Sequence, residues 1–252
     1  MRAPLLVLTL AACSRPSTPT GAAPEPTPAA SPAPAGDDVL ETSAGRVQFH
    51  PVHHGTVYFT IGDKVVWVDP WSKADLTGPR ADLVLVTDIH QDHFDAAAIA
   101  SVRKDDALVI APAVVAEQLA GAVVLANGES RDLGFVRVEA VPMYNLVRGP
   151  EEGKLFHDKG RGNGYVLTIG DRRVYLSGDT ECTPEMKALR DIDVAFVCMN
   201  LPYTMPPSEA AACVAAFKPR VLYPYHYRDS DLGELDAGLA GSGVEVRRRD
   251  WY

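Results

Sequence analysis

Residues 86–95 of this 252-residue chain read Val-Thr-Asp-Ile-His-Gln-Asp-His-Phe-Asp and place four potential metal ligands within six positions. Residues 83–86 form an uninterrupted apolar run, typical of a strand buried on both faces. First-row divalent cations bind carboxylates and imidazoles, which are supplied here by Asp88, His90, Asp92 and His93. Asp95 then fits the N-cap of a helix over residues 96–103. This order favours a metal-binding loop over a solvated acidic turn with incidental histidines.

The composition bounds the classes of protein to consider. With 46% hydrophobic and 23% charged residues, the chain can bury a large core, and its length fits one large domain or two small ones. The formal net charge is −9, and it becomes −10 without the first twelve residues, whose only charged side chain is Arg2. An acidic balance of this size argues against nucleic acid as the main partner.

The N-terminus predicts export. Arg2 is followed by an apolar segment to residue 12 that is too short to span a bilayer, as in a signal peptide. Leu-Ala-Ala-Cys at residues 10–13 resembles the lipobox of bacterial lipoproteins, which implies that Cys13 is acylated and anchors the chain to a membrane. The alternative is a secreted protein with a free cysteine. Ser14, rather than aspartate, weakly favours the outer membrane, with the folded domain in the periplasm or at the cell surface.

The segment after the cysteine is a linker. Residues 13–36 are rich in Pro, Ala, Ser and Thr and contain almost no large apolar side chains, so they cannot bury enough surface to fold. We therefore expect a signal peptide at residues 1–12, an acylated cysteine with its linker at 13–36, and one folded domain at 37–252.

The other three cysteines give no sign of a disulfide framework. They lie at positions 182, 198 and 213, an odd number at irregular spacing, and no Cys-x-x-Cys supports a structural zinc site. Cys198 and Cys213 are expected to be small buried apolar residues. For Cys182 we assign no role, because it closely follows the polar segment Gly178-Asp179-Thr180.

Many short strands and few helices fit layered sheets flanked by helices. Strands are expected at residues 46–49, 56–60, 65–68, 83–86, 108–110, 123–125, 134–141, 165–169, 173–176, 194–198, 221–223 and 244–247. Helices are expected at 96–103, 114–119, 184–189 after a Thr183 cap, and 208–217.

Polar residues follow five of these strands at the point where each strand ends. They are Asp69, the 88–93 cluster, Tyr144-Asn145, Asp179 and His226. Strand ends on one side of a sheet can converge, so a site can be assembled from distant parts of the sequence.

The combined motifs resemble the metallo-β-lactamase-fold superfamily, especially the branch that contains ascorbate-phosphate lactonase. The resemblance spans roughly residues 46–228. It rests on Asp-x-His-x-Asp-His at 88–93, Ser-Gly-Asp-Thr at 177–180, the later His226, and the upstream His54-Gly55-Thr56 and Val68-Asp69-Pro70. It implies an α/β (α+β) fold, a four-layer αββα sandwich with the metal site in the cleft between the sheet edges.

The resemblance also implies a set of ligands. By position, Asp88 and His90 would bind one metal, Asp92, His93 and His226 a second, and Asp179 would bridge them. Two departures stand out: Asp88 replaces the usual histidine, and Tyr144-Asn145 stands where another histidine is expected. A carboxylate in place of an imidazole shifts preference toward harder ions such as Mn or Fe. The first metal would then be weak, absent, or completed by Asn145 or His157.

Other polar residues have candidate roles near the cleft. The glycine-rich segment 159–164 is followed by a strand rather than a helix, so it is not a nucleotide loop. It could instead cover the cleft, where His157, Lys159 or Arg161 would meet an anionic group, or it could be a solvated turn. His54 is expected to support a ligand rather than bind metal directly. Tyr203 either lines the pocket or belongs to an ordinary proline-fixed connection.

These observations favour a metal-dependent hydrolase, most simply with one or two zinc ions. A metal-bound hydroxide, oriented by Asp92, would attack an ester, lactone, phosphodiester or related bond of a small-molecule, anionic substrate. Three alternatives stay open: a di-iron redox enzyme, a non-catalytic metal-binding surface lipoprotein, and a β-lactamase proper.

Overall fold

The structure is a computed structural model that describes residues 38–252. The predicted signal peptide, the acylated Cys13 and the linker lie outside the described residues. Within residues 38–252, no helix has both the length and the apolar character needed to cross a membrane.

Two seven-stranded sheets form the framework. The first has the order β1-β2-β3-β4-β5-β6-β7 and the second the order β14-β13-β12-β11-β10-β9-β8. The first comprises β1 (Val39–Thr42), β2 (Gly45–His53), β3 (Thr56–Ile61), β4 (Lys64–Val68), β5 (Ala81–Leu85), β6 (Arg103–Ala111) and β7 (Val123–Val124). The second comprises β8 (Ser130–Asp132), β9 (Arg137–Met143), β10 (Gly162–Ile169), β11 (Arg172–Leu176), β12 (Val194–Cys198), β13 (Val221–Tyr225) and β14 (Glu245–Val246).

The two sheets share one pattern of pairing. In each sheet the four strands that come first in the sequence (β1 to β4, and β8 to β11) pair antiparallel. The three strands that follow (β5 to β7, and β12 to β14) are added in parallel. Parallel neighbours need a crossover connection, usually a helix. Here α1 (Ala96–Val102) joins β5 to β6, while α4 (Pro207–Phe217) and α5 (Leu232–Leu239) make the corresponding connections after β12 and β13.

Two of the predicted helices begin at the capping side chains expected from the sequence. Asp95 accepts hydrogen bonds from the backbone N–H groups of Ala97 and Ala98, both at 3.0 Å, at the start of α1. Thr183 accepts one from Met186 at 3.1 Å at the start of α3 (Pro184–Lys187). The remaining helix, α2 (Ala113–Ala116), lies in the predicted region around 114–119.

One helix was not predicted. Helix α5 contains two glycines, which are poor helix formers, so its local sequence signal is weak. Its buried face consists of Leu232, Leu235 and Leu239, and the helix packs against α4. Tertiary packing therefore stabilises α5 where propensity does not.

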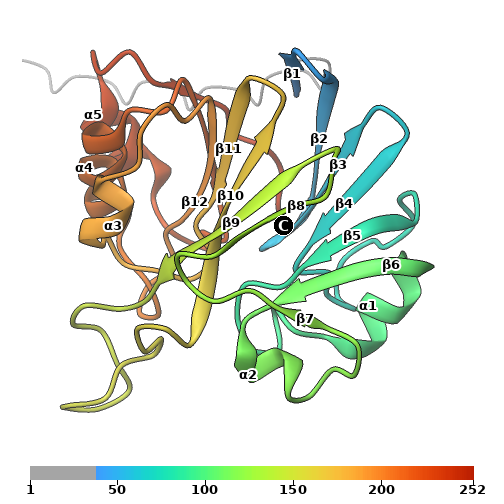
Figure 1. Ribbon diagram of the computed structural model, residues 1–252. Helices are drawn as coiled ribbons and strands as arrows, with labels where there is room; N and C mark the ends of the chain where they lie inside the picture. The colour runs from blue at the N-terminus through green and yellow to red at the C-terminus, as the bar shows by residue number, and fades with distance from the viewer. Residues whose placement is uncertain (1–37) are drawn as a thin grey trace, which may run out of the picture. The chain divides into compact units, whose positions relative to one another are not determined.

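The layers follow the order helix, sheet, sheet, helix. Figure 1 shows α3, α4 and α5 outside the second sheet and α1 beside the first sheet. Between the sheets, Phe49 of β2 and Phe59 of β3 contact Phe196 of β12, with ring centroids 5.6 and 5.8 Å apart. On the other face of the first sheet, Ile99 of α1 packs with Trp67 of β4. The predicted αββα sandwich is confirmed.

The cysteine prediction was wrong on one point. Cys182 and Cys213 form a disulfide across 31 residues of sequence, although their spacing carries no recognisable pattern. The two meet because Cys182 lies just before α3 and Cys213 lies within α4, and these helices are neighbours. Cys213 and the free Cys198 are both buried, as expected.

One predicted strand is in fact a hairpin. Residues 134–141 were expected to be a single strand, but residues 133–136 turn between β8 and β9. The backbone N–H of Leu133 donates to the carbonyl of Val136 at 3.0 Å, and Gly134 takes a φ of 83°, which glycine adopts without a side-chain clash.

Candidate metal centre

The polar residues at the strand ends come together at one edge of the two sheets. Beyond the five ends noted in the sequence, His54 follows β2 and also reaches this edge. A cavity of about 380 Å³ opens there. Its lining residues are Trp71, Lys73, His90, Gln91, Asp92, Phe156, His157, Asp179, Asn200, Tyr203, His226 and Arg228.

Asp88, His90 and His157 form what we call the first ligand group. One donor atom from each lies within 4.8 Å of the other two. His90 Nδ1 is 2.8 Å from Asp88 Oδ2, and His157 Nε2 is 3.8 Å from the same oxygen. His157 thus supplies the third donor of this group, which is one of the possibilities that the sequence left open.

Asn145 orients the His157 ring, and its amide oxygen is not left over as a metal ligand. Its amide nitrogen donates to Glu181 Oε1 at 3.2 Å and to the carbonyl of Tyr203 at 2.8 Å. Its Oδ1 therefore faces His157 Nδ1, at 2.5 Å, and accepts the proton of that nitrogen. The lone pair of His157 Nε2 is left for the ligand group.

Glu181 holds this arrangement, a role that the sequence analysis did not predict. The side chain is 2% exposed and accepts hydrogen bonds from the backbone N–H groups of Leu146, Val147 and Arg148 at 2.9 to 3.1 Å. Burial raises the pKa of Glu181, but these bonds and Asn145 outweigh it and lower the pKa overall. A carboxylate fixed in this way keeps the 145–148 segment, and with it Asn145, in place.

His93, Asp179 and His226 form the second ligand group. Their donor atoms also lie within 4.8 Å of one another. Asp179 Oδ2 is 3.4 Å from His93 Nε2, and Asp179 Oδ1 is 3.4 Å from His226 Nε2. Asp179 Oδ2 is also 3.5 Å from His157 Nε2. Asp179 therefore lies between the two groups, where a bridging ligand would be.

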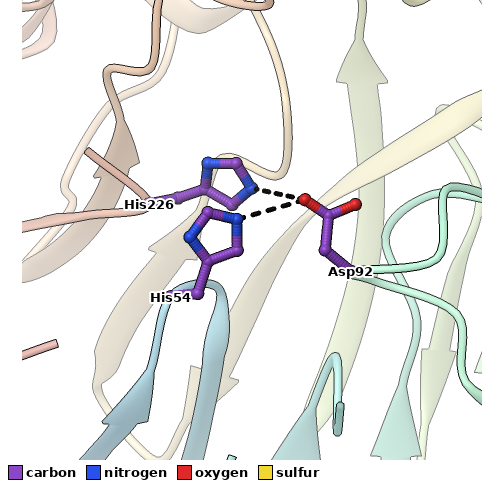
Figure 2. A group of neighbouring side chains, drawn as sticks. All are labelled: His54, Asp92 and His226. Carbon is purple, nitrogen blue, oxygen red and sulfur yellow. Dashed lines mark hydrogen bonds and ion pairs between the residues drawn. The ribbon is translucent and has the colours of Figure 1, made fainter. Parts of the chain in front are cut away.

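His54 and Asp92 extend the second group. Figure 2 shows the imidazoles of His54 and His226 pointing at the Asp92 carboxylate. Their Nε2 atoms lie 3.1 and 3.4 Å from Asp92 Oδ2. His54 Nδ1 is 2.9 Å from the hydroxyl of Tyr252, which fixes the ring from the other side. The sequence led us to expect a supporting role for His54. In the structure its donor atom lies within 4.8 Å of those of Asp92 and His226, so these three residues could hold one ion together.

Asp69 orients His93. This aspartate is fully buried, and its Oδ2 accepts hydrogen bonds from His93 Nδ1 at 2.7 Å and from the Thr87 hydroxyl at 2.5 Å. The Thr87 backbone N–H donates to Oδ1 at 2.8 Å. Metal-binding histidines commonly donate their second nitrogen to a carboxylate in this way. The sequence signal was an aspartate directly after a buried strand.

Gly55 leaves room for two of the imidazoles. A Cβ atom at this position would lie 3.3 Å from His226 Cδ2 and 3.6 Å from His93 Cε1. A Cβ here would crowd the His226 ring and would reach ordinary van der Waals contact with the His93 ring. The glycine therefore lets His93 and His226 approach each other, with ring centroids 5.0 Å apart.

The residues fit a divalent cation. Four buried atoms at this edge have no hydrogen-bond partner among residues 38–252, namely Nε2 of His93, His157 and His226 and Oδ1 of Asp179. Leaving a buried polar group unpaired costs about 1–3 kcal/mol. Four such atoms that converge are accounted for if they bind a cation, and a set rich in imidazole suits zinc or iron.

The electrostatics favour the same conclusion. Burial lowers the pKa of both His54 and His157 to about 4, so these imidazoles stay neutral and able to bind metal near pH 7. Burial also lowers the pKa of His93, but Asp179 and Asp69 outweigh it and raise the pKa well above its usual value. The site thus holds a positive charge at His93 until a metal replaces the proton.

Two residues predicted to contact substrate are instead paired within the protein. Arg161 donates to both oxygens of Asp88, at 3.3 and 3.1 Å, and Lys159 Nζ is 2.5 Å from Glu185 Oε1. Neither appears among the described residues that line the cavity, whereas Tyr203 does. The cations at the cavity are Lys73 and Arg228, which the sequence analysis did not single out.

Comparison with known proteins identifies the class. Residues 48–226 match the family model described as a β-lactamase superfamily domain. Together with the αββα fold and the ligand groups, this match shows that the chain belongs to the metallo-β-lactamase superfamily.

Within that superfamily the chain belongs to the UPF0173 metal-dependent hydrolases. It is 31% identical over 200 residues to such a protein of Pelotomaculum thermopropionicum, covering 73% of this chain and 86% of that one. A solved structure from Parabacteroides distasonis, described as a metal-dependent hydrolase, is 42% identical with a TM-score of 0.81 and coverage of 85% and 98%. A metallo hydrolase from Ignicoccus hospitalis, 21% identical with a TM-score of 0.66 and coverage of 81% and 95%, shares the fold. The protein is thus a metal-dependent hydrolase.

Proposed function

We propose that this hydrolase binds two zinc ions, one at each ligand group, and cleaves an ester, lactone or phosphodiester bond in a small anionic substrate. The observation that carries the proposal is the convergence of His93 Nε2, His157 Nε2, His226 Nε2 and Asp179 Oδ1, which are buried and have no hydrogen-bond partner among residues 38–252. His157, His226 and Asp179 also line the cavity. When bound, such an ion lowers the pKa of a coordinated water to about 7 and polarises the scissile bond.

Asp92 is the residue we assign to orienting the attacking water. Its side chain is 23% exposed and lines the cavity, so the carboxylate can accept a hydrogen bond from water there. Burial raises the pKa of Asp92, but His226 and His54 outweigh it and hold the pKa well below its usual range. Asp92 is therefore ionised at neutral pH and can accept a hydrogen bond there.

The charge at the cavity supports an anionic substrate. Lys73 and Arg228 line it, and among residues 38–252 neither forms an ion pair with a carboxylate. Their charges are free to bind an anionic group of the substrate. The charge of the nearby Arg161 is not free to bind substrate, because Arg161 already forms an ion pair with Asp88.

The test is elemental analysis of the purified protein combined with turnover on an ester, a lactone, a phosphodiester and a β-lactam. We expect two zinc ions per chain and activity on at least one of the first three classes. Asp92→Asn should lower kcat by about 10²- to 10⁴-fold. Asp82→Asn, which removes a partly buried carboxylate paired with Lys64 and Lys104, should not lower kcat. Turnover that requires iron and oxygen would instead indicate the redox enzyme.

We also propose that the protein is exported and anchored through Cys13. The support is the Cys182–Cys213 disulfide, because disulfides persist in oxidising compartments and are rare in the cytosol. Fractionation of cells should find the protein with the membranes and should find the Cys13→Ser variant uncleaved or released. Recovery of both proteins in the cytosol, with Cys182 and Cys213 reduced, would contradict the proposal.

A further inference from the structure

A second chamber of about 480 Å³ adjoins the metal cavity. Trp71, Lys73 and Arg228 line both spaces, so these three side chains form the boundary between the two. His54 connects them as well, because it lines the second chamber and its Nε2 is 3.1 Å from Asp92 in the first. No step of the proposed hydrolysis uses this second chamber.

The walls of the chamber are mainly aromatic. His53 stacks on Trp71, with ring centroids 5.8 Å apart and an interplanar angle of 23°. Tyr252 meets His53 edge to face at 5.6 Å and is half exposed. Rings arranged in this way offer both faces and edges to a planar group, which aromatic side chains bind by stacking and by edge contacts.

The boundary between the two spaces is cationic. Lys73 Nζ lies 4.7 Å from the centre of the Trp71 ring, and the guanidinium of Arg228 lies 5.9 Å from that of Tyr203. These contacts leave the donors of both cations available, since neither makes an ion pair within residues 38–252. Asp229 supplies the only carboxylate side chain among the described residues of the second chamber.

We propose that the second chamber binds a planar aromatic or heteroaromatic arm of the substrate, and that Lys73 and Arg228 hold an anionic group next to that arm at the boundary. The scissile bond then extends from this anion toward Asp92 in the metal cavity. This inference rests on the proposed hydrolysis and narrows its substrate to aryl-bearing anions. A compact anion would leave the aromatic walls in contact with water.

The test uses the zinc-loaded protein and three probes in titration calorimetry. Naphthalene-2-sulfonate carries both the ring and the charge, naphthalene-2-methanol lacks the charge, and methanesulfonate lacks the ring. We expect naphthalene-2-sulfonate to bind at least tenfold more tightly than either of the others. Lys73→Ala and Arg228→Ala should each weaken it about tenfold, the loss expected for one hydrogen bond to a charged group, and Trp71→Leu about fivefold.

Two controls separate this inference from the proposed function. Arg131→Ala, which removes an exposed cation of β8, should leave probe binding unchanged. His90→Ala should slow hydrolysis and still bind naphthalene-2-sulfonate, because His90 does not line the second chamber. Equal affinity for methanesulfonate, unchanged affinity in the Lys73→Ala/Arg228→Ala double variant, or a crystal structure with the sulfonate on zinc and the chamber empty would overturn the inference. Normal probe binding without turnover would instead count against the hydrolysis.

Discussion

The two ligand groups contain similar donors but differ in how firmly they are held. In the second group the side chains of His93 and His226 are 1% exposed and that of Asp179 is 5% exposed. In the first group the side chain of His90 is 43% exposed, and Asp88 already has a cationic partner in Arg161. A metal entering the first group must compete with a guanidinium, whereas in the second group it displaces only a proton from His93. We therefore expect the second group to fill first and to bind more tightly.

The comparison also shows two ways to orient an imidazole. A carboxylate, Asp69, holds His93, whereas a neutral amide, Asn145, holds His157. A carboxylate makes the ring a stronger ligand, since it stabilises positive charge on the imidazole. This difference again favours the second group.

The largest effect should come from removing His226, which belongs to the second group and to the trio with His54 and Asp92. His226→Ala should lose the ion of the second group and lower kcat/KM by more than about 100-fold. His90→Ala should lose only the ion of the first group. Elemental analysis measures the zinc content of both variants. A tightly held ion in the second group of His226→Ala would contradict this prediction.

The next effect concerns the carboxylate behind His93. Asp69→Asn should weaken zinc binding at the second group by about 10- to 100-fold, the usual cost of losing such a partner. Competition with a chromogenic chelator measures the change. Asp82→Asn serves as the control, and equal losses of affinity at both groups would show that Asp69 acts on the fold rather than on His93.

The reciprocal change tests the amide behind His157. Asn145→Ala should weaken the first group by about tenfold and leave the second group unchanged. Chelator titration resolves the two steps. If both steps shift together, the two groups are not independent.

The pH dependence should also differ between the groups. The pKa of His93 is raised in the metal-free protein, so the ring is protonated at neutral pH and must release that proton on binding. Zinc affinity of the second group should then fall by up to about tenfold for each unit that the pH drops below this pKa. The pKa of His157 is about 4, so this residue adds no such dependence between pH 6 and 8. Calorimetry in buffers of different ionisation enthalpy counts the protons released, and none released at the second group would refute the argument.

The smallest effect should be a gain. Arg161→Met removes the cation that competes for Asp88, so zinc affinity of the first group should rise about three- to tenfold. Lys159→Met is the matched control, because Lys159 pairs with Glu185 instead. An unchanged or lower affinity in Arg161→Met would mean that the arginine helps to position Asp88.

Much of the site could be predicted because its residues follow strand ends. Asp88, His90, Asp92 and His93 lie within six positions of the sequence, so a local pattern revealed them. Asp179 and His226 were found because each follows a buried strand, and such ends converge at one edge of a sheet. The helices at Asp95 and Thr183 were predicted from their capping side chains.

What could not be predicted depends on contacts between distant segments. Glu181 binds backbone groups of residues 146–148, Tyr252 reaches His54 across 198 residues, and Cys182 pairs with Cys213. Helix α5 was missed for a similar reason, since its packing on α4 outweighs its two glycines. None of these partners leaves a periodic or spaced pattern in the chain.

Residues 86–95 therefore predict, by themselves, a metal-binding loop at the end of a buried strand. Ligand chemistry and strand periodicity are local properties, and they can be read in order along the chain. Only the tertiary structure decided that His157 completes the first group. It also decided that Asn145 holds the His157 ring with Nε2 toward Asp88, and that Arg161 competes for the Asp88 carboxylate. Each of these relations needs two segments to be packed at a few ångströms, and that distance is set by the folded core.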